Sequence, residues 1–99
     1  MAAPGGEQQG KALRRTSQFK RDAKLAKRRG KDLSKLRAVV EKLAAGEELE
    51  ERLRDHALAG GYKGSRECHV EPDWLLIYEA TDEEVVLIRT GTHSDLFKK

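Results

Sequence analysis

The sequence has a single cysteine and no long apolar run, and each of these shortages excludes a class of protein. The single thiol, Cys68, cannot form a disulfide within the chain, which is typical of a reducing compartment. A transmembrane helix needs about 18 or more consecutive apolar residues, and no such stretch occurs. The opening segment, MAAPGGEQQG, lacks the apolar stretch of a secretory signal. We therefore expect a cytoplasmic protein with no membrane partner.

Aromatic residues are also scarce, at 5% of the chain, and apolar residues make up 37%. A chain of 99 residues with this composition can bury only a modest core, so we expect one small domain. The first ten residues include one Pro, three Gly and two Gln, a content that is typical of a flexible leader. The expected division is a leader at 1–10 and a single domain at 11–99.

Charge is abundant but unevenly distributed. Residues 1–45 carry 13 Lys or Arg and four Asp or Glu, a balance of +9, whereas residues 46–99 carry seven and 13, a balance of −6. The basic half fits a polyanionic partner such as RNA. The same charges could equally cover the solvated faces of Lys-rich helices, and charge alone leaves both interpretations open.

Apolar spacing predicts two helices in the basic half. The first is expected after Ser17, a candidate N-cap, and Gly30 can end it. The second is expected after Asp32 and can end at Gly46. Their apolar stripes consist of Phe19, Ala23 and Ala26 in the first helix and of Leu33, Leu36, Val40 and Leu43 in the second.

The rest of the chain favours strands. An opening strand within 11–19 is expected before the helices, and the acidic segment 46–61 is expected to be a connector. Three strands should follow in YKGSRECHV, WLLIYEA and EEVVLIRTG, with Pro72 between the first two and a final turn in THSDLFKK. The predicted fold class is α+β, with two N-terminal helices packed on a small antiparallel sheet. The other face, or its rim, would stay open and carry His69, Trp74, Arg89 and His93.

The three histidines and the cysteine do not have the spacing of a structural metal site. None of His56, Cys68, His69 and His93 forms a short ligand pair of the zinc type, and adjacent residues in a strand point to opposite faces. The same geometry argues against thiol catalysis by Cys68 with His69. We expect no metal or other cofactor, and we expect Cys68 to be a small buried residue.

Acid–base cleavage of RNA suits these residues better. A ribose 2′-OH can attack the neighbouring phosphate if a base takes its proton, an acid protonates the leaving 5′-oxygen and cations hold the phosphate. Histidine can fill both proton roles near neutral pH, arginine suits phosphate, and an exposed aromatic can stack on a base. On the residues alone, however, His93 could be an ordinary surface histidine, Trp74 a core residue and Arg89 the partner of a nearby acid.

Two segments of the sequence are more informative than these residue types alone. The segments DHALAGGYKGSRECHVEPDWLLIYE and IRTGTHSDLF resemble toxins of bacterial toxin–antitoxin modules, in the YafQ branch of the RelE/ParE superfamily. The resemblance runs from about Thr16 to Phe97 and includes the helical stretch FKRDAKLAKRRGKDLSKL. It implies a microbial-RNase fold with two N-terminal helices on a curved antiparallel sheet. It also implies metal-free cleavage of mRNA in the ribosomal A site and neutralisation by an antitoxin.

The resemblance also transfers a set of site residues. It implies a catalytic set of His56, Glu67, His69, Asp73 and His93 and an RNA-binding set of Trp74, Arg89 and Phe97. The chain departs from the family pattern at Ala57, where proline is common, at Glu67, where aspartate is common, and in its long leader.

Within this set we expect His93 to be the general acid, and His69, Asp73 or Glu67 to be on the base side. His56 and Arg89 would contact phosphate, while Trp74 and Phe97 would position bases. The alternatives are a ParE-like binding module that blocks DNA gyrase and an inactive toxin homologue. The joint presence of three histidines with Asp73 favours the nuclease.

Overall fold

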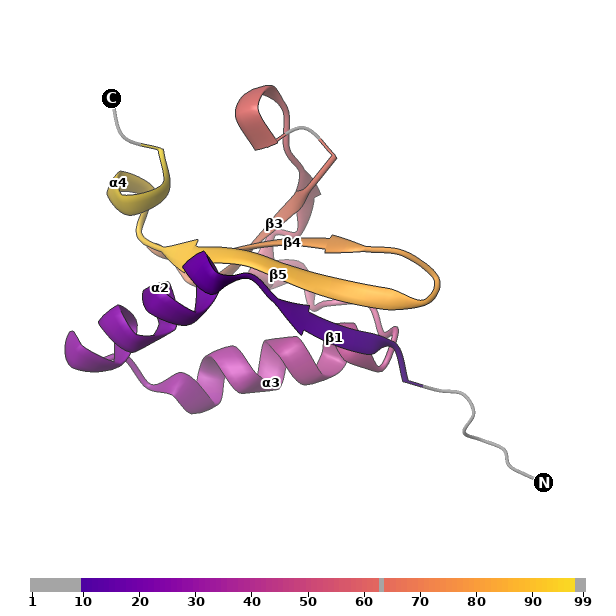
Figure 1. Cartoon of the computed structure of the whole chain (residues 1–99), viewed down its shortest axis with the longest axis horizontal. Helices are drawn as coiled ribbons and strands as arrows, with labels where there is room; N and C mark the ends of the chain where they lie inside the picture. Colours follow the sequence, from indigo (N-terminus) through magenta and orange to yellow (C-terminus); the bar gives the residue numbers. More distant parts are fainter. Residues whose placement is uncertain (1–9, 63, 98–99) are drawn as a thin grey trace.

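The computed structural model describes residues 10–62 and 64–97, so most of the expected leader lies outside the described residues. It shows one short strand, then two long helices, then the remaining strands of the sheet and one terminal helical turn (Figure 1). The strands are β1 (Ala12–Arg15), β2 (His56–Ala57), β3 (Arg66–Glu71), β4 (Trp74–Ala80) and β5 (Glu84–Gly91). The helices are α2 (Ser17–Arg28), α3 (Leu33–Ala44) and α4 (His93–Leu96), with 3₁₀ turns η1 (Glu51–Leu53) and η2 (Gly60–Tyr62). No helix in the described part of the chain is long and apolar enough to cross a membrane.

The helix ends are where polar residues and glycines predict them, with one correction. Thr16, not Ser17, caps α2, because its side chain accepts a hydrogen bond from the backbone N–H of Phe19. Asp32 caps α3 through the N–H of Ser34, as expected. Gly30 and Gly46 follow the helices with φ of +87° and +78°, a conformation that glycine adopts without strain.

The strands form one five-stranded sheet in the order β1-β5-β4-β3-β2. Strands β3 to β5 are antiparallel, as expected, and β2 adds a short antiparallel strand within the segment that we expected to be a connector. Strand β1 pairs in parallel with β5, so the sheet is mixed. The two strands of this pair are the first and the last in the chain, and β1 forms the edge of the sheet. The α+β class is confirmed, and the sheet differs from the expected one in the parallel pairing of β1 and in the additional strand β2.

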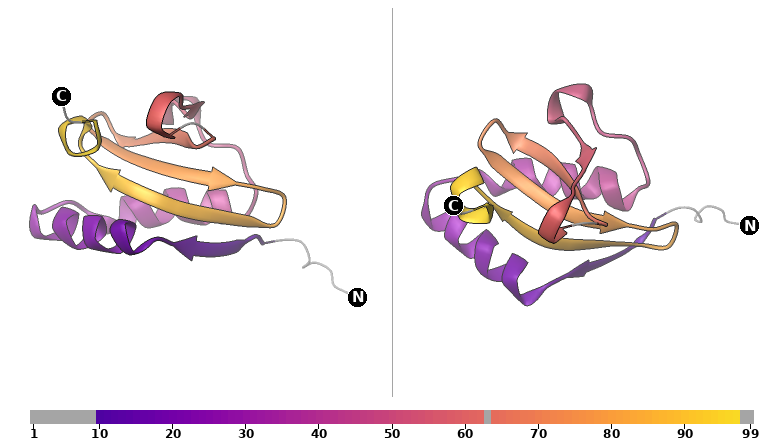
Figure 2. Two further views of the ribbon diagram at one scale, coloured as in Figure 1. Left: turned by 45° about the horizontal axis from the view of Figure 1, so that its top comes forward. Right: turned by 90° about the horizontal axis from the view of Figure 1, so that it is seen from above.

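The two long helices cover one face of the sheet (Figures 1 and 2). The main core lies between the helices and the sheet. It consists of Phe19, Ala26, Leu36, Val39, Leu43, Leu53, Cys68, Val70, Trp74, Leu76, Tyr78, Val85 and Leu87. The side chain of Cys68 is fully buried here, as predicted. Burial raises the pKa of its thiol to about 12, which makes Cys68 a poor nucleophile.

The opposite face is covered, so of the two surfaces that we expected to be open, the face or its rim, only the rim is exposed. Leu75, Ile77 and Leu96 form a second buried cluster there, against which Leu58, Tyr62, Ile88 and Phe97 pack. Figure 2 shows α4 and the segment around η2 lying over the sheet on the side away from α2 and α3. The polar residues of the predicted site therefore lie at the rim between these covering segments.

Candidate active site

The three histidines lie in a row although they come from three different elements. His56 is in β2, His69 is in β3, and His93 is the first residue of α4. The ring centroids of His56 and His69 are 6.4 Å apart, and those of His69 and His93 are 5.8 Å apart. His69 is the most buried of the three, with 17% of its side chain exposed, against 50% for His56 and 54% for His93. The fold thus assembles one cluster from positions up to 37 residues apart in the sequence.

Glu67 lies beneath the first two histidines. It is opposite His56 in the antiparallel register of β2 and β3, and it shares a strand face with His69 two residues later. Its Oε1 is 3.1 Å from Nε2 of His56 and 3.6 Å from Nε2 of His69. With only 6% of its side chain exposed, this carboxylate needs polar partners, and the two imidazoles provide them.

The backbone fixes the tautomer of His56. Its Nδ1 lies 2.7 Å from the carbonyl oxygen of Arg54, which can only accept, so Nδ1 donates this hydrogen bond. The other nitrogen, Nε2, faces Glu67. The Arg54 carbonyl and the Glu67 carboxylate, 3.1 Å from Nε2, thus lie on opposite sides of the ring and fix its orientation.

His93 is held by Asp73. The Oδ1 atom of Asp73 lies 2.6 Å from Nδ1 of His93 and accepts a second hydrogen bond, of 3.0 Å, from the backbone N–H of the same residue. The backbone N–H of His93, and then its imidazole, lower the pKa of Asp73, which keeps the carboxylate ionised. Both side chains are more than half exposed, so the pair faces solvent at the rim.

Two ion-pair clusters hold the segments that carry this pair. Asp95 forms a capping box with Thr92 at the start of α4 and pairs with Arg29 at the end of α2 at 2.7 Å. Arg29 is the main reason that the pKa of Asp95 falls to about 2. On the other side, Lys31 and Lys35 both bind the carboxylate of Glu71, just before the turn that carries Asp73. Lys35 and then Lys31 lower the pKa of Glu71.

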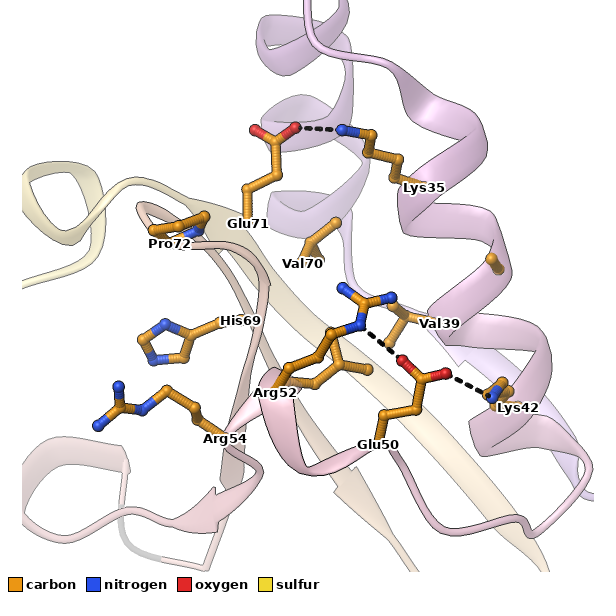
Figure 3. Close-up of a pocket in the computed structure, with 12 residues that line it drawn as sticks. Lys35, Val39, Lys42, Glu50, Arg52, Arg54, His69, Val70, Glu71 and Pro72 are labelled. Atoms are coloured by element: carbon orange, nitrogen blue, oxygen red, sulfur yellow. Dashed lines mark hydrogen bonds and ion pairs between the residues drawn. The ribbon is translucent and has the colours of Figure 1, made fainter.

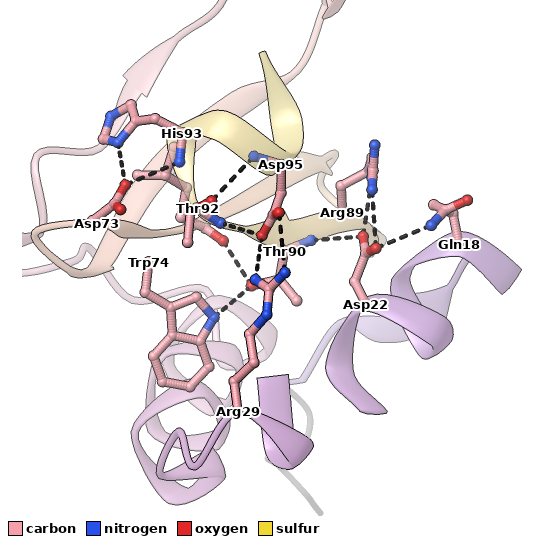
Figure 4. A network of polar contacts seen from close by, with 11 residues as sticks. Gln18, Asp22, Arg29, Asp73, Trp74, Arg89, Thr90, Thr92, His93 and Asp95 are labelled. Atoms are coloured by element: carbon pink, nitrogen blue, oxygen red, sulfur yellow. Dashed lines mark hydrogen bonds and ion pairs between the residues drawn. The ribbon is translucent and has the colours of Figure 1, made fainter. Parts of the chain in front are cut away.

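Trp74 does not lie in the site, and its predicted role in RNA binding is wrong. Its side chain points to the helix face and is 1% exposed, so no base can stack on it. Its Nε1–H donates a hydrogen bond of 2.9 Å to Thr90 Oγ1, which donates in turn to the carbonyl of Leu75 at 2.6 Å (Figure 4). Trp74 instead fixes the ends of β4 and β5 to each other. Trp74 is therefore the first residue of the buried strand β4 and does not belong to the polar segment that ends at Asp73.

Arg89 is bound by an acid that sequence reasoning missed. Its Nε and one terminal nitrogen each donate a hydrogen bond of 3.0 Å to Asp22 of α2, which also accepts from the backbone N–H of Thr90 (Figure 4). Asp22, which is 7% exposed, is the main reason that the pKa of Arg89 is raised. The signal was present in the sequence: Asp22 lies between Phe19 and Ala26 on the apolar stripe of α2, where a carboxylate needs a partner.

Phe97 lies beyond α4 and packs on Tyr62, with ring centroids 5.8 Å apart and planes at 86°. It is partly buried against the second core cluster. The structure therefore brings together His56, Glu67, His69, Asp73 and His93, places Phe97 at the edge of the covering layer, and separates Trp74 and Arg89 from the histidine row. Within 10–62 and 64–97, no group of three His, Cys, Asp or Glu side chains is arranged to hold a metal ion.

Two helices on one face of a five-stranded sheet, with histidines and carboxylates gathered at one rim, define a small α+β protein with a cluster of acid–base groups. The family described as "Bacterial toxin of type II toxin-antitoxin system, YafQ" matches residues 11–98. The chain belongs to this family.

Relatives of the chain agree with this assignment. It is 45% identical to the mRNA interferase toxin YafQ of Escherichia coli strain K12 over 83 residues, which cover 83% of this chain and 90% of that protein. Its structure matches the crystal structure of YafQ from E. coli BL21(DE3) with a TM-score of 0.85 at 41% identity, covering 88% of this chain and 98% of the other. It also matches the toxin in the E. coli DinJ–YafQ toxin–antitoxin complex, with a TM-score of 0.83 at 41% identity over 90% and 99% of the two chains.

Proposed function

We propose that this chain is an mRNA interferase, an endoribonuclease toxin that cuts mRNA in the A site of the ribosome by metal-free acid–base chemistry. The observation that carries this proposal is the row of three histidines, spaced 6.4 and 5.8 Å apart and backed by Glu67 and Asp73. General acid–base cleavage of RNA needs two proton-transfer groups on opposite sides of one phosphate, a few ångströms apart. A toxin that acts on ribosomes would work in the cytoplasm. The family match over 11–98 supports treating 11–99 as one toxin domain.

The base side of the reaction falls to His69. It lies at the centre of the row, and Glu67 is close enough to stabilise the imidazolium that forms when His69 takes the proton of the ribose 2′-OH. The 2′-oxygen then attacks phosphorus and the bond to the 5′-oxygen breaks. The products are a 2′,3′-cyclic phosphate on the upstream fragment and a 5′-hydroxyl on the downstream one.

The acid side falls to His93. Because its Nδ1 is directed to Asp73, its Nε2 is the nitrogen left to deliver a proton to the leaving 5′-oxygen. Asp73 then orients His93 and stabilises its charged form, in the way that a carboxylate orients the histidine of other acid–base pairs. This arrangement moves Asp73 from the base side, where the sequence suggested it, to the acid side.

The remaining contacts to RNA are more distant from the row. Arg89 keeps 25% of its side chain exposed and, with Phe97, can contact nucleotides that flank the cut. The exposed basic residues of α2, which include Lys20, Lys24, Lys27 and Arg28, fit the phosphates of ribosomal RNA. Ribosome binding of this kind would weaken steeply with added salt.

An antitoxin protein is the proposed regulatory partner. The related E. coli toxin is seen in complex with DinJ, and this chain covers 99% of the toxin in that structure. We propose that a cognate antitoxin binds this chain in the same way and keeps it inactive until the toxin is released from the complex.

The proposal is tested by mapping mRNA ends on programmed ribosomes incubated with the protein. Wild type should cut within the A-site codon, and His93→Ala should lower the cleavage rate by at least about 100-fold, because the general acid is lost. Ser94→Ala, at the next exposed position of α4, is the matched control and should cut at the wild-type rate. Intact mRNA with wild type, or equal cutting by His93→Ala, would rule out the nuclease and leave a gyrase-blocking or inactive homologue.

A further inference from the structure

The histidine row has acid and base groups, but Arg89, the cation that we expected to bind phosphate, is already paired with Asp22. Cleavage places additional negative charge on the phosphate oxygens, and a cation close to them gives the largest stabilisation of that charge. Arg89 is paired with Asp22 through two hydrogen bonds, and it lies on the α2 side of the network, away from His93 and Asp73 (Figure 4). Another cation is needed at the row itself.

Arg54 lies at the row, and no described residue forms an ion pair with its side chain. It is two residues before His56, and its carbonyl oxygen accepts the hydrogen bond from His56 Nδ1. Its side chain is exposed, and no carboxylate among residues 10–62 and 64–97 forms an ion pair with it. The adjacent Asp55 is engaged by Arg66 and by the hydroxyl of Tyr78, at 3.1 and 2.7 Å. The guanidinium of Arg54 therefore keeps its donors for a ligand.

A groove leads away from Arg54. It lies between α3 on one side and η1 with β3 on the other, and has a volume of about 770 Å³ (Figure 3). His69 and Arg54 both line it, and Figure 3 shows the Arg54 guanidinium on the same side of the groove as the His69 imidazole. Farther along, Lys35, Lys42 and Arg52 also line it. The acids there are already paired: Glu50 with Arg52 and Lys42, and Glu71 with Lys31 and Lys35.

The backbone at Arg54 is a second, independent observation. Its φ of +53° and ψ of +45° lie in the left-handed region, where glycine or asparagine is favoured. Among the described residues it is the one non-glycine residue with a positive φ. Strained residues of this kind occur where the surrounding structure holds a side chain in position for function.

We propose that Arg54 is a catalytic residue that binds the phosphate at the cut, and that the adjacent groove holds the RNA strand leading away from it. The proposal rests on the function proposed above, because it assigns a phosphate ligand to the same site. Arginine suits this position because its planar group can donate two parallel hydrogen bonds to phosphate oxygens. Arg89 then fixes β5 to α2, and its exposed part is left to contact nucleotides that flank the cut rather than the cut phosphate.

The test uses four variants of the full chain on programmed ribosomes, at saturating toxin and in single turnover. Arg54→Gln should lower the rate constant of cleavage on the order of 100-fold, as loss of one donor to a transition-state oxygen does. Arg54→Lys should recover part of the rate because it restores the charge without the paired donors. Arg37→Gln is the matched control: it removes the same charge from an exposed position of α3 that does not line the groove, and should stay within about twofold of wild type.

Arg54→Gly distinguishes the effect of losing the side-chain charge from an effect on the stability of the fold. Glycine adopts a φ of +53° without strain, so this variant should have a melting temperature equal to or above that of wild type. It should nevertheless cut as slowly as Arg54→Gln. Cleavage by Arg54→Gln at the rate of Arg37→Gln, or cleavage by Arg54→Gly at the wild-type rate, would overturn the Arg54 assignment while leaving the nuclease in place. A wild type that cuts no mRNA would instead overturn the proposed function.

Discussion

Asp73 binds His93 twice, at 2.6 Å through the imidazole Nδ1 and at 3.0 Å through the backbone N–H. The two contacts join the β3–β4 turn to the first residue of α4 and fix the direction of the imidazole ring. The same carboxylate would therefore set both the position and the tautomer of the proposed general acid.

Replacing Asp73 with asparagine tests this arrangement. An amide cannot stabilise the charged imidazole as a carboxylate does, so Asp73→Asn should lower the cleavage rate constant by about 10- to 100-fold with little change in ribosome affinity. Because the pKa of Asp73 is lowered, the wild-type carboxylate stays ionised throughout the neutral range. Asp82→Asn, in the exposed β4–β5 loop, makes the same chemical change away from the site and should cut normally. Equal rates for the two variants would remove Asp73 from the mechanism.

Asp95 should make the stability of α4 depend on pH. Its pKa is lowered to about 2 in the folded chain, against about 3.9 for an unfolded one. Its contribution is therefore complete above the unfolded value and is lost as the pH falls through the folded one. Asp95→Asn should lower the free energy of unfolding by about 1 kcal/mol at pH 6, and this difference should shrink towards pH 2. Urea unfolding at several pH values measures it, and a difference that stays constant down to pH 2 would exclude the Arg29–Asp95 pair as its source.

The Asp22–Arg89 pair should couple α2 to β5. Removing either partner leaves the other without its main partner in a mostly buried place, so Asp22→Ala and Arg89→Ala should each destabilise the chain by roughly 2–4 kcal/mol. Removing both should cost less than the two single changes together, with a coupling of about 1–3 kcal/mol. Equilibrium unfolding of the four proteins gives this value. Simple additivity would show that the two hydrogen bonds contribute little to the fold.

Trp74 should affect stability rather than chemistry. Trp74→Phe keeps most of the buried ring but loses the hydrogen bond to Thr90, so the free energy of unfolding should fall by about 1–3 kcal/mol. Cleavage on ribosomes, measured where the variant is fully folded by circular dichroism, should stay within about threefold of wild type. A large loss of cleavage in the folded variant would show that the tryptophan has a role beyond packing.

Much of the fold could be predicted because it depends on local signals. The helices around Leu36 and the strands around Ile77 follow from apolar spacing, and Asp32, Gly30 and Gly46 mark their ends. The parallel pairing of β1 with β5 could not be predicted, because it joins Ala12 to Glu84 across the whole domain.

The candidate site was predictable as a set of residues but not as an arrangement. The histidines and acids were recognised through short strings, and the structure places five of them together. The direction of Trp74 depends on the register of β4 after the irregularity between His69 and Glu71 in β3, which no local pattern reveals. Arg54 gave no signal at all, since its left-handed backbone and free side chain appear only in the folded chain.

The most direct test of cleavage through the ribose 2′-OH uses an mRNA with a single 2′-deoxynucleotide at the mapped cut position. Without the 2′-OH there is no internal nucleophile, so wild-type protein on programmed ribosomes should leave this mRNA intact at that position. It should cut the all-ribose mRNA and release a downstream fragment with a 5′-hydroxyl. Cutting of the deoxy substrate at the same position, or a 5′-phosphate on the downstream fragment, would contradict the account.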